Sequence, residues 1–233
     1  MLAGGLATRM LPLTEATPKI LLQVAGRPFL SHLLDRLQES GFEQVVLAVG
    51  HLADAVRDAA EGEARRRLLD IRVSEDGPRL LGTGGALCAA LPLLQETFLV
   101  TYGDSYLPFN YSGPLDHLRA HPSGRAAMAV FQNHDEIEPS NVAIAGGRVL
   151  RYDKRRSEAV TMDHIDYGAT AIRRSEIEAL RPGEAVGLDT MLGHLALSGG
   201  LLAFPVQDRF FEIGSPAGFA DLERRLAAEA RAS

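Results

Sequence analysis

The spacing of apolar residues predicts a chain in which helices and buried strands alternate. Over residues 27–40, leucine and phenylalanine recur at intervals of three and four, which predicts an amphipathic helix that Gly41 would end. Residues 44–49 form a continuous apolar run, as expected of a strand buried on both faces. A second helix over 53–68 and a strand over 71–74 repeat this order. The alternation is typical of βαβ units in an α/β fold.

The alternation continues to about residue 131 and then gives way to shorter elements. The apolar run over 98–104 predicts another buried strand, which ends in a glycine and an aspartate. Gly146-Gly147 separates two short strand-like segments and indicates a tight hairpin, so a small lobe is expected there. Asp189 is placed to cap a helix, a strand is expected over 201–206, and a final helix follows.

Composition and charge narrow the class of protein. The chain has 233 residues, 46% of them apolar, which suits one α/β domain. A net charge of -6 argues against general binding to a nucleic-acid backbone, and no apolar run approaches the length of a membrane span. A single cysteine, Cys88, excludes a disulfide framework and a cysteine-rich zinc site. We therefore expect a soluble, cytoplasmic protein. The arginine run at 65–67 is interpreted as a solvated helix face.

The N-terminal stretch carries the strongest indication of chemistry. Gly4 and Gly5 are followed by Arg9 and then by Lys19. Glycines let backbone amides approach an anion closely, and the two cations would bring positive charge to the same place. The spacing fits neither a Walker loop nor a dinucleotide-binding turn, which makes a nicotinamide enzyme improbable. Lys19 and Lys154 are the only lysines in a chain rich in arginine, which suggests that each is needed as a compact point charge.

This stretch resembles the signature of the sugar-1-phosphate nucleotidylyltransferases. Leu-Ala-Gly-Gly, Thr-Arg, Pro-Leu-Thr and Pro-Lys occur at the family's spacing between residues 2 and 19. The resemblance implies a Rossmann-like three-layer α/β/α sandwich with a mostly parallel mixed sheet and a small sugar-binding lobe. It implies a single domain over 1–233, with a nucleotide-binding half over about 1–131 and a sugar-binding half over about 132–233. It also implies nucleotide-binding residues and two catalytic cations. The nucleotide-binding residues would be Leu2, Ala3, Gly4, Gly5 and Thr8, and the catalytic cations would be Arg9 and Lys19.

Three further segments match the family. The glycine turn at Leu81–Leu87 opens a helix that is expected to run to about Leu91. It corresponds to the segment that lines the base and ribose in the family, through Gly82, Thr83, Gly84 and Gly85. Asp104 matches the family's first Mg2+ ligand. Glu212 stands where the family has its second, an aspartate, and Asp208 is a fallback ligand. Oxygen ligands of this kind suit Mg2+, which binds through one or two carboxylates and substrate phosphates.

The segments that correspond to the family's sugar-binding site match it less completely than the nucleotide-binding segments do. Lys154 matches a lysine that contacts the phosphate of the sugar 1-phosphate, although the family's following proline is missing, and Arg155 or Arg156 are alternatives. Asp166, Tyr167 and Gly168 correspond to the strand that faces the sugar, and only the glycine is retained. Asp166 is equally well read as a strand-end carboxylate in solvent. These departures leave the sugar open.

The implied reaction joins a nucleoside triphosphate to a sugar 1-phosphate and releases diphosphate. Among short family members, the chain looks closest to heptose- or mannose-1-phosphate guanylyltransferases, which implies GTP, in a monomer or homodimer. The hexapeptide repeats of bifunctional relatives do not occur in the sequence. Two alternatives remain open. One is a CTP-dependent enzyme acting on an amino-alcohol phosphate or phosphonate, and the other is a non-catalytic nucleotide-sugar sensor.

Overall fold

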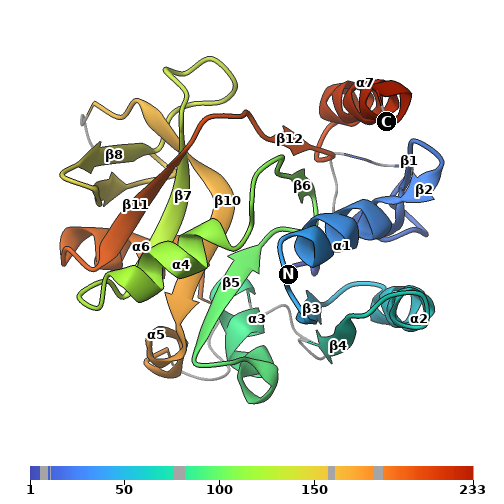
Figure 1. Ribbon diagram of the computed structural model, residues 1–233, viewed down its shortest axis with the longest axis horizontal. Coiled ribbons are helices and arrows are strands. Elements are labelled where there is room, and N and C mark those ends of the chain that lie inside the picture. The colour runs from blue at the N-terminus through green and yellow to red at the C-terminus, as the bar shows by residue number, and fades with distance from the viewer. Residues whose placement is uncertain (6–9, 11, 76–81, 157–160, 181–185, 233) are drawn as a thin grey trace. The chain divides into compact units, whose positions relative to one another are not determined.

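The computed structural model describes residues 1–5, 10, 12–75, 82–156, 161–180 and 186–232. The chain divides into two compact units, which are described separately and can be followed in Figure 1. The first unit combines Met1–Leu80, Tyr102–Pro108 and Phe210–Ser233, and the second combines Leu81–Thr101 and Phe109–Arg209. Each unit is therefore built from separate stretches of sequence.

The first unit contains the βαβ arrangement that the apolar pattern predicts. β3 (Gln44–Val49) and β4 (Asp70–Glu75) pair in parallel, and α2 (Ala53–Ala64) connects them. Leu2 adds a parallel bridge to Ala48 on β3. The unit also contains η2 (Lys19–Leu21), β1 (Gln23–Val24), β2 (Arg27–Pro28), α1 (Phe29–Glu39), β6 (Ser105–Tyr106), β12 (Phe211–Glu212) and α7 (Pro216–Ala232).

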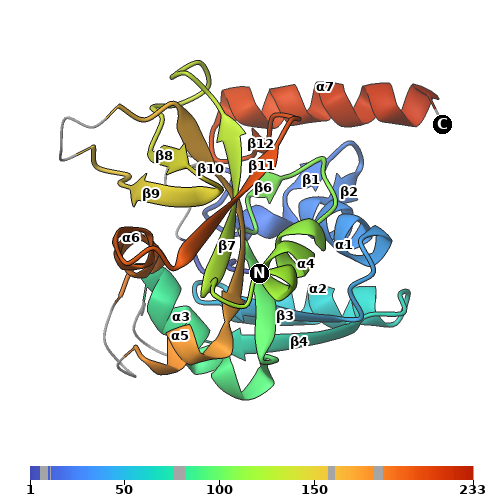
Figure 2. The same cartoon turned by 60° about the vertical axis from the view of Figure 1, so that its left-hand side comes forward.

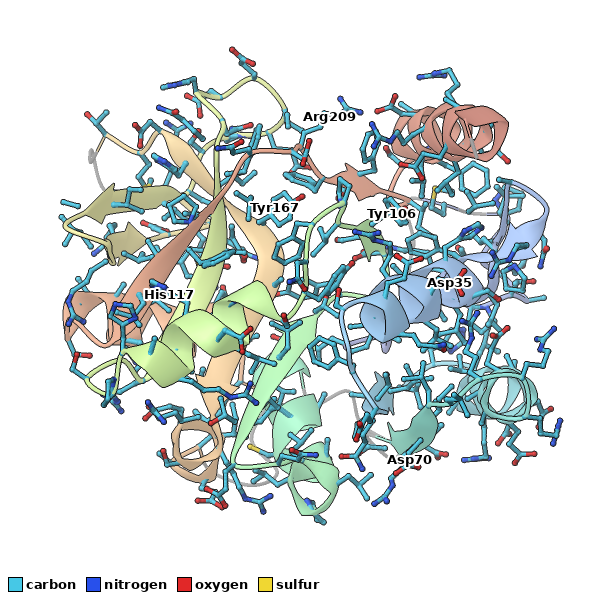
Figure 3. The ribbon with its side chains drawn as sticks, in the orientation of Figure 1. Asp35, Asp70, Tyr106, His117, Tyr167 and Arg209 are labelled. Carbon is cyan, nitrogen blue, oxygen red and sulfur yellow. The ribbon has the colours of Figure 1, made fainter. Side chains whose placement is uncertain are left out.

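A partly buried polar network joins α1 to the end of α2. Glu63 accepts hydrogen bonds from Ser31 and Arg67 at 2.7 Å each, and Arg67 also pairs with Asp35, which Figure 3 labels on α1. Burial alone would raise the pKa values of Asp35 and Glu63, but hydrogen bonds from their partners outweigh it and lower both. Arg67 is only 12% exposed, so the prediction of a solvated arginine run is wrong for this residue.

The second unit is organised on a six-stranded mixed sheet. Its strand order is β5-β10-β7-β11-β9-β8, with β5 (Thr97–Thr101), β7 (Ala126–Gln132), β8 (Val142–Ala145), β9 (Arg148–Tyr152), β10 (His164–Arg173) and β11 (Leu201–Val206). Among the described residues of this sheet, only β7 and β11 pair in parallel, so its pairing differs from a mostly parallel arrangement. The hairpin at Gly146-Gly147 explains part of this, because a two-residue turn can only join antiparallel strands.

Helices cover the sheet of the second unit. They are α3 (Gly82–Ala90), η3 (Leu91–Leu93), α4 (Gly113–Ala120), α5 (Arg174–Glu178) and α6 (Leu188–Leu197). Figure 2 shows α4 and α6 on opposite faces of the sheet. The N-cap of α6 is Gly187, so Asp189 lies inside the first turn and does not cap the helix as predicted. Among the helices of the described residues, none combines the length and apolar character that crossing a membrane needs.

Candidate active site

The first unit places Lys19 against Asp104. Lys19 is the first residue of η2, directly after Pro18, and Asp104 lies in the turn at Gly103-Asp104 that leads into β6. The Lys19 ammonium donates to Oδ2 of Asp104 at 3.0 Å. The two side chains are 16% and 35% exposed, so the pair is screened by solvent only in part. Lys19 and Asp104 thus form one charged centre. They are 85 positions apart in sequence, and two separate motifs predicted them.

Glu212 belongs to the same local structure. β12 pairs with β6 so that Glu212 lies opposite Ser105, the neighbour of Asp104. The amide of Ile213 donates to the backbone oxygen of Asp104 at 2.9 Å, which extends this two-stranded ribbon by one step. The ribbon therefore carries both predicted Mg2+ ligands. Asp208, the fallback ligand, is an exposed residue of the second unit.

The start of the chain packs beside this ribbon. The amide of Gly103 donates to the Leu2 carbonyl at 2.8 Å, and Ala3 donates to Ala48 of β3 at 2.8 Å. A Cβ on Gly103 would lie 2.9 Å from Ile20, the residue after Lys19, and 3.1 Å from Ala3. Only glycine permits this close approach, which brings the Leu2–Gly5 segment, η2 and Asp104 together.

Of the remaining residues of the first motif, the structure describes Gly4 and Gly5. Gly4 lies close to Gly50, where an added Cβ would be 3.1 Å from the backbone nitrogen, whereas an added Cβ on Gly5 would meet nothing within 4 Å. Gly5 is also exposed, so its backbone is open to a ligand. Thr8 and Arg9 lie outside the described residues, and their predicted roles stay predictions.

The donor set of the first unit fits Mg2+. Asp104 and Glu212 supply hard carboxylate oxygens, and Mg2+ is typically held by one or two carboxylates with substrate phosphates and water completing the shell. Within the part of the chain that the structure describes, no cluster of three or more histidine, cysteine, aspartate or glutamate side chains forms a metal cage. A site with two carboxylates leaves coordination positions for a nucleotide, as nucleotidyl transfer needs.

The second glycine turn lies in the second unit and has an internal reason for its glycines. The amide of Gly84 donates to the Val186 carbonyl at 2.8 Å, and a Cβ there would lie 2.9 Å from the same oxygen. Gly82 adopts a positive φ of 70°. The hydroxyl of Thr83 accepts a hydrogen bond from the amide of Leu188, at the start of α6, at 2.7 Å. Thr83 and Gly84 therefore fix the turn to the segment before α6, a role that sequence spacing could not reveal.

Lys154 and Asp166 also lie together in the second unit. The Lys154 ammonium is 3.8 Å from Oδ2 of Asp166, whose side chain is only 5% exposed. The same oxygen accepts a hydrogen bond from the Tyr152 hydroxyl at 2.7 Å, and Oδ1 accepts one from the amide of Gly168 at 3.0 Å. Asp166 is thus not a solvated strand-end carboxylate.

Tyr167, which the resemblance places at the sugar, is buried in the core of the second unit. Tyr167 is labelled in Figure 3 on β10 and is 1% exposed, with its ring packed edge-on against Phe109 at 5.2 Å. It therefore supports the strand from the core.

Tyr152 was not predicted from the sequence to be a site residue. The only signal was its place at the end of the predicted hairpin, two residues before Lys154.

Comparisons with known proteins show which family the chain belongs to. Residues 1–182 match the family model of the MobA-like NTP transferase domain. The chain is 29% identical over 236 residues to a mannose-1-phosphate guanylyltransferase from Mycobacterium tuberculosis, covering 97% of this chain and 65% of that protein. It is 28% identical to an N-acetylmuramate alpha-1-phosphate uridylyltransferase from Caulobacter vibrioides, covering 99% of this chain and 95% of the relative.

The fold is found in solved structures as well. The crystal structure of HddC from Yersinia pseudotuberculosis matches with a TM-score of 0.79 at 21% identity, over 97% of both chains, and that protein has also been solved with GMP-PN. This confirms the predicted α/β fold class. The chain spans less than two thirds of the length of several curated relatives, including the mycobacterial one. Because the family model covers most of the described sequence, the chain belongs to the nucleotidyltransferase family of the MobA-like NTP transferase domain.

Proposed function

We propose that the protein is a sugar-phosphate nucleotidylyltransferase, which converts a nucleoside triphosphate and a sugar 1-phosphate into a nucleotide sugar and diphosphate. The observation that carries the proposal is the Lys19–Asp104 pair at 3.0 Å. Asp104 adjoins the ribbon of β6 and β12 that also bears Glu212, and the Leu2–Gly5 segment packs beside it. A cation, the carboxylate paired with it, a second carboxylate on the neighbouring strand and exposed backbone thus belong to one local structure. Binding a triphosphate and stabilising the charge that develops at its α-phosphorus requires these groups.

The reaction is an in-line displacement at the α-phosphorus. An oxygen of the sugar 1-phosphate attacks, the bond to the bridging oxygen of the β-phosphate breaks, and diphosphate leaves. A phosphate monoester is already an anion near neutral pH, so this chain need not supply a general base. Lys19 would stabilise charge at the α-phosphoryl group, and the amides of the Leu2–Gly5 segment would hold the triphosphate. The family resemblance assigns Arg9 to the leaving diphosphate.

Asp104 and Glu212 would hold the Mg2+ ion. When bound, Mg2+ supplies charge neutralisation and a template for phosphate oxygens. Lys19 then has a second task, because its contact with Oδ2 of Asp104 orients that carboxylate. On the acceptor side, Lys154 would bind the phosphate of the sugar 1-phosphate. Catalysis then depends on positioning and electrostatics, as in phosphoryl transfer generally.

Two substrate pairs deserve to be tested first. GTP with mannose 1-phosphate or a heptose 1-phosphate is supported by the mycobacterial relative and by the likeness to short guanylyltransferases. UTP with N-acetylmuramate α-1-phosphate is supported by the Caulobacter relative, because that protein matches this chain over 95% of its own length. Acceptors of both pairs are sugar 1-phosphates, so the site that Lys154 would form suits either.

A substrate matrix tests the proposal. Four nucleoside triphosphates are each combined with mannose 1-phosphate, a heptose 1-phosphate, N-acetylmuramate α-1-phosphate and phosphocholine, and diphosphate release is followed with Mg2+ present. Release with a sugar 1-phosphate that is lost in Lys19→Ala supports the proposal. Release with phosphocholine and CTP alone would favour the amino-alcohol alternative. Nucleotide binding without release from any pair would favour the sensor and contradict the proposal.

A further inference from the structure

Both lysines of the chain are paired with an aspartate. In the first unit, Lys19 contacts Asp104 at 3.0 Å, and in the second, Lys154 lies 3.8 Å from Asp166. Every other basic side chain that could be charged at high pH is an arginine. An ammonium group has no fixed plane, so its direction must come from its neighbours. Each lysine therefore needs an anchor, and the two anchors differ in how firmly they are held.

Asp166 is held on all sides. Its Oδ2 accepts from the Tyr152 hydroxyl at 2.7 Å, its Oδ1 accepts from the Gly168 amide at 3.0 Å, and its own amide donates to Oδ1 of Asn141 at 2.9 Å. Gly168 has a positive φ of 90°, which turns its amide back toward the carboxylate. With its side chain 5% exposed, Asp166 depends on these hydrogen bonds in place of water.

These contacts leave Asp166 poorly suited to bind sugar hydroxyls. Both of its oxygens already accept hydrogen bonds within the protein, and little of the side chain reaches solvent. The Lys154 side chain, in contrast, is 43% exposed, and its ammonium lies 5.9 Å from the centre of the Tyr152 ring. Lys154 is thus the accessible member of the group, and Tyr152 and Asp166 lie beneath it.

We infer that Tyr152 is a positioning residue for the acceptor phosphate. Through its hydroxyl it fixes Asp166, and Asp166 in turn directs the Lys154 ammonium, which receives the phosphate monoester of the sugar 1-phosphate. The inference rests on the proposed function for the identity of the acceptor. Asp166 then orients the lysine, and we expect that removing the hydroxyl of Tyr152, a residue only 5% exposed, weakens binding of the acceptor alone.

Asp166 also acts on acceptor binding in the opposite direction, and one variant separates this effect from orientation. A carboxylate near Lys154 repels an incoming phosphate and competes with it for the ammonium, so its removal could strengthen binding. If orientation dominates, Asp166→Asn weakens binding of the acceptor. If competition dominates, the same variant tightens it. The two readings predict changes of opposite sign in one measured quantity.

The test compares Tyr152→Phe and Asp166→Asn with the wild type and with Tyr111→Phe as a control. Tyr111 is a buried tyrosine of the same unit, 1% exposed, whose ring packs against Phe109 at 5.0 Å. Steady-state kinetics with GTP and mannose 1-phosphate, or the best pair from the matrix, give KM for each substrate separately. Melting temperatures check that each variant is folded.

We expect Tyr152→Phe and Asp166→Asn to raise KM for the sugar 1-phosphate about tenfold, as for the loss of one hydrogen bond to a charged group. KM for the nucleotide should stay unchanged, and the double variant should be no worse than Asp166→Asn, because both changes act on one contact. Tyr111→Phe should leave both KM values unchanged. A KM for the sugar 1-phosphate within twofold of wild type in Tyr152→Phe, or a lower one in Asp166→Asn, would overturn the inference.

A binding measurement separates this inference from the proposed function. If the wild type releases no diphosphate with any pair, the proposed function fails, and calorimetric titration with mannose 1-phosphate then tests the inference alone. Weaker binding in Tyr152→Phe than in wild type would support it without turnover. Equal binding in the two proteins, or no binding to the wild type, would overturn it. Should Tyr152→Phe fail to fold, Asp166→Asn carries the same comparison.

Discussion

The contact between α7 and the ribbon of β6 and β12 predicts that two apparently similar glycine substitutions differ in their effect on stability. Gly218 lies in the first turn of α7, and Gly62 lies in α2. A Cβ on Gly218 would lie 2.4 Å from the carbonyl oxygen of Glu212, whereas a Cβ on Gly62 would meet nothing within 4 Å. Both changes replace a helical glycine with alanine, so they differ mainly in this contact.

The magnitude follows from the distance. Carbon and carbonyl oxygen normally approach to about 3.3–3.6 Å, so Gly218→Ala must move the start of α7 or the Glu212 backbone by about 1 Å. Overpacking of this kind typically costs about 1–3 kcal/mol. Alanine in a helix interior gains about 0.8–1 kcal/mol over glycine, which Gly62→Ala receives without strain. We therefore expect Gly62→Ala to raise stability and Gly218→Ala to lie about 1–3 kcal/mol below it.

Urea unfolding of the three proteins measures this difference directly, because a change in midpoint at constant slope reports stability. A second readout connects the strain to the site. Since Glu212 is a proposed Mg2+ ligand, Gly218→Ala should raise the Mg2+ concentration that gives half-maximal diphosphate release, and Gly62→Ala should not. If both variants are stabilised to the same extent and need the same Mg2+ concentration as wild type, then α7 does not hold Glu212 in place through this contact.

Three other predictions follow from the site and from the α1–α2 network. Lys19→Ala and Asp104→Ala should each lower turnover by about 100-fold or more while the circular dichroism spectrum stays native, and near-normal turnover in either would refute its role. Glu212→Gln should raise the Mg2+ requirement of diphosphate release by about tenfold or more, and an unchanged Mg2+ titration would remove this residue from the metal site. The lowered pKa values of Asp35 and Glu63 mean that the unfolded chain takes up protons first, so their contribution to stability is complete above their ordinary values of 3.8 and 4.5. Melting temperatures measured from pH 6 to pH 3 should therefore fall below about pH 4.5, and a flat profile would contradict this.

Elements with a strong local pattern were predictable from the sequence. β3 and β11 occupy the predicted ranges because their apolar runs are continuous and bounded by polar or glycine residues. The hairpin at Gly146-Gly147 is confirmed, with both glycines at positive φ. The pairing of Lys19 with Asp104 was foreseeable only through the resemblance, because nothing in the intervening 85 positions links the two residues.

What could not be predicted depends on partners far away in sequence. Arg67 looked like part of a solvated run, but α1 brings Asp35 to it and buries it. Gly84 looked like a ligand-binding glycine, and the structure shows that its amide is used by Val186, about 100 positions later. Asp166 is buried by a tyrosine on the neighbouring hairpin. Local periodicity carries no information on such contacts, since they are set by the packing of complete elements.

The central claim is that the bond between the α- and β-phosphates breaks and that the α-phosphate stays with the sugar. Nucleoside triphosphate labelled at the α-phosphorus, incubated with Mg2+ and the best sugar 1-phosphate, tests it most directly. We expect label in the nucleotide sugar and, with γ-labelled nucleotide, label in diphosphate, both lost in Lys19→Ala. Label released as orthophosphate from the γ-position, with none of the α-label reaching the sugar, would contradict it.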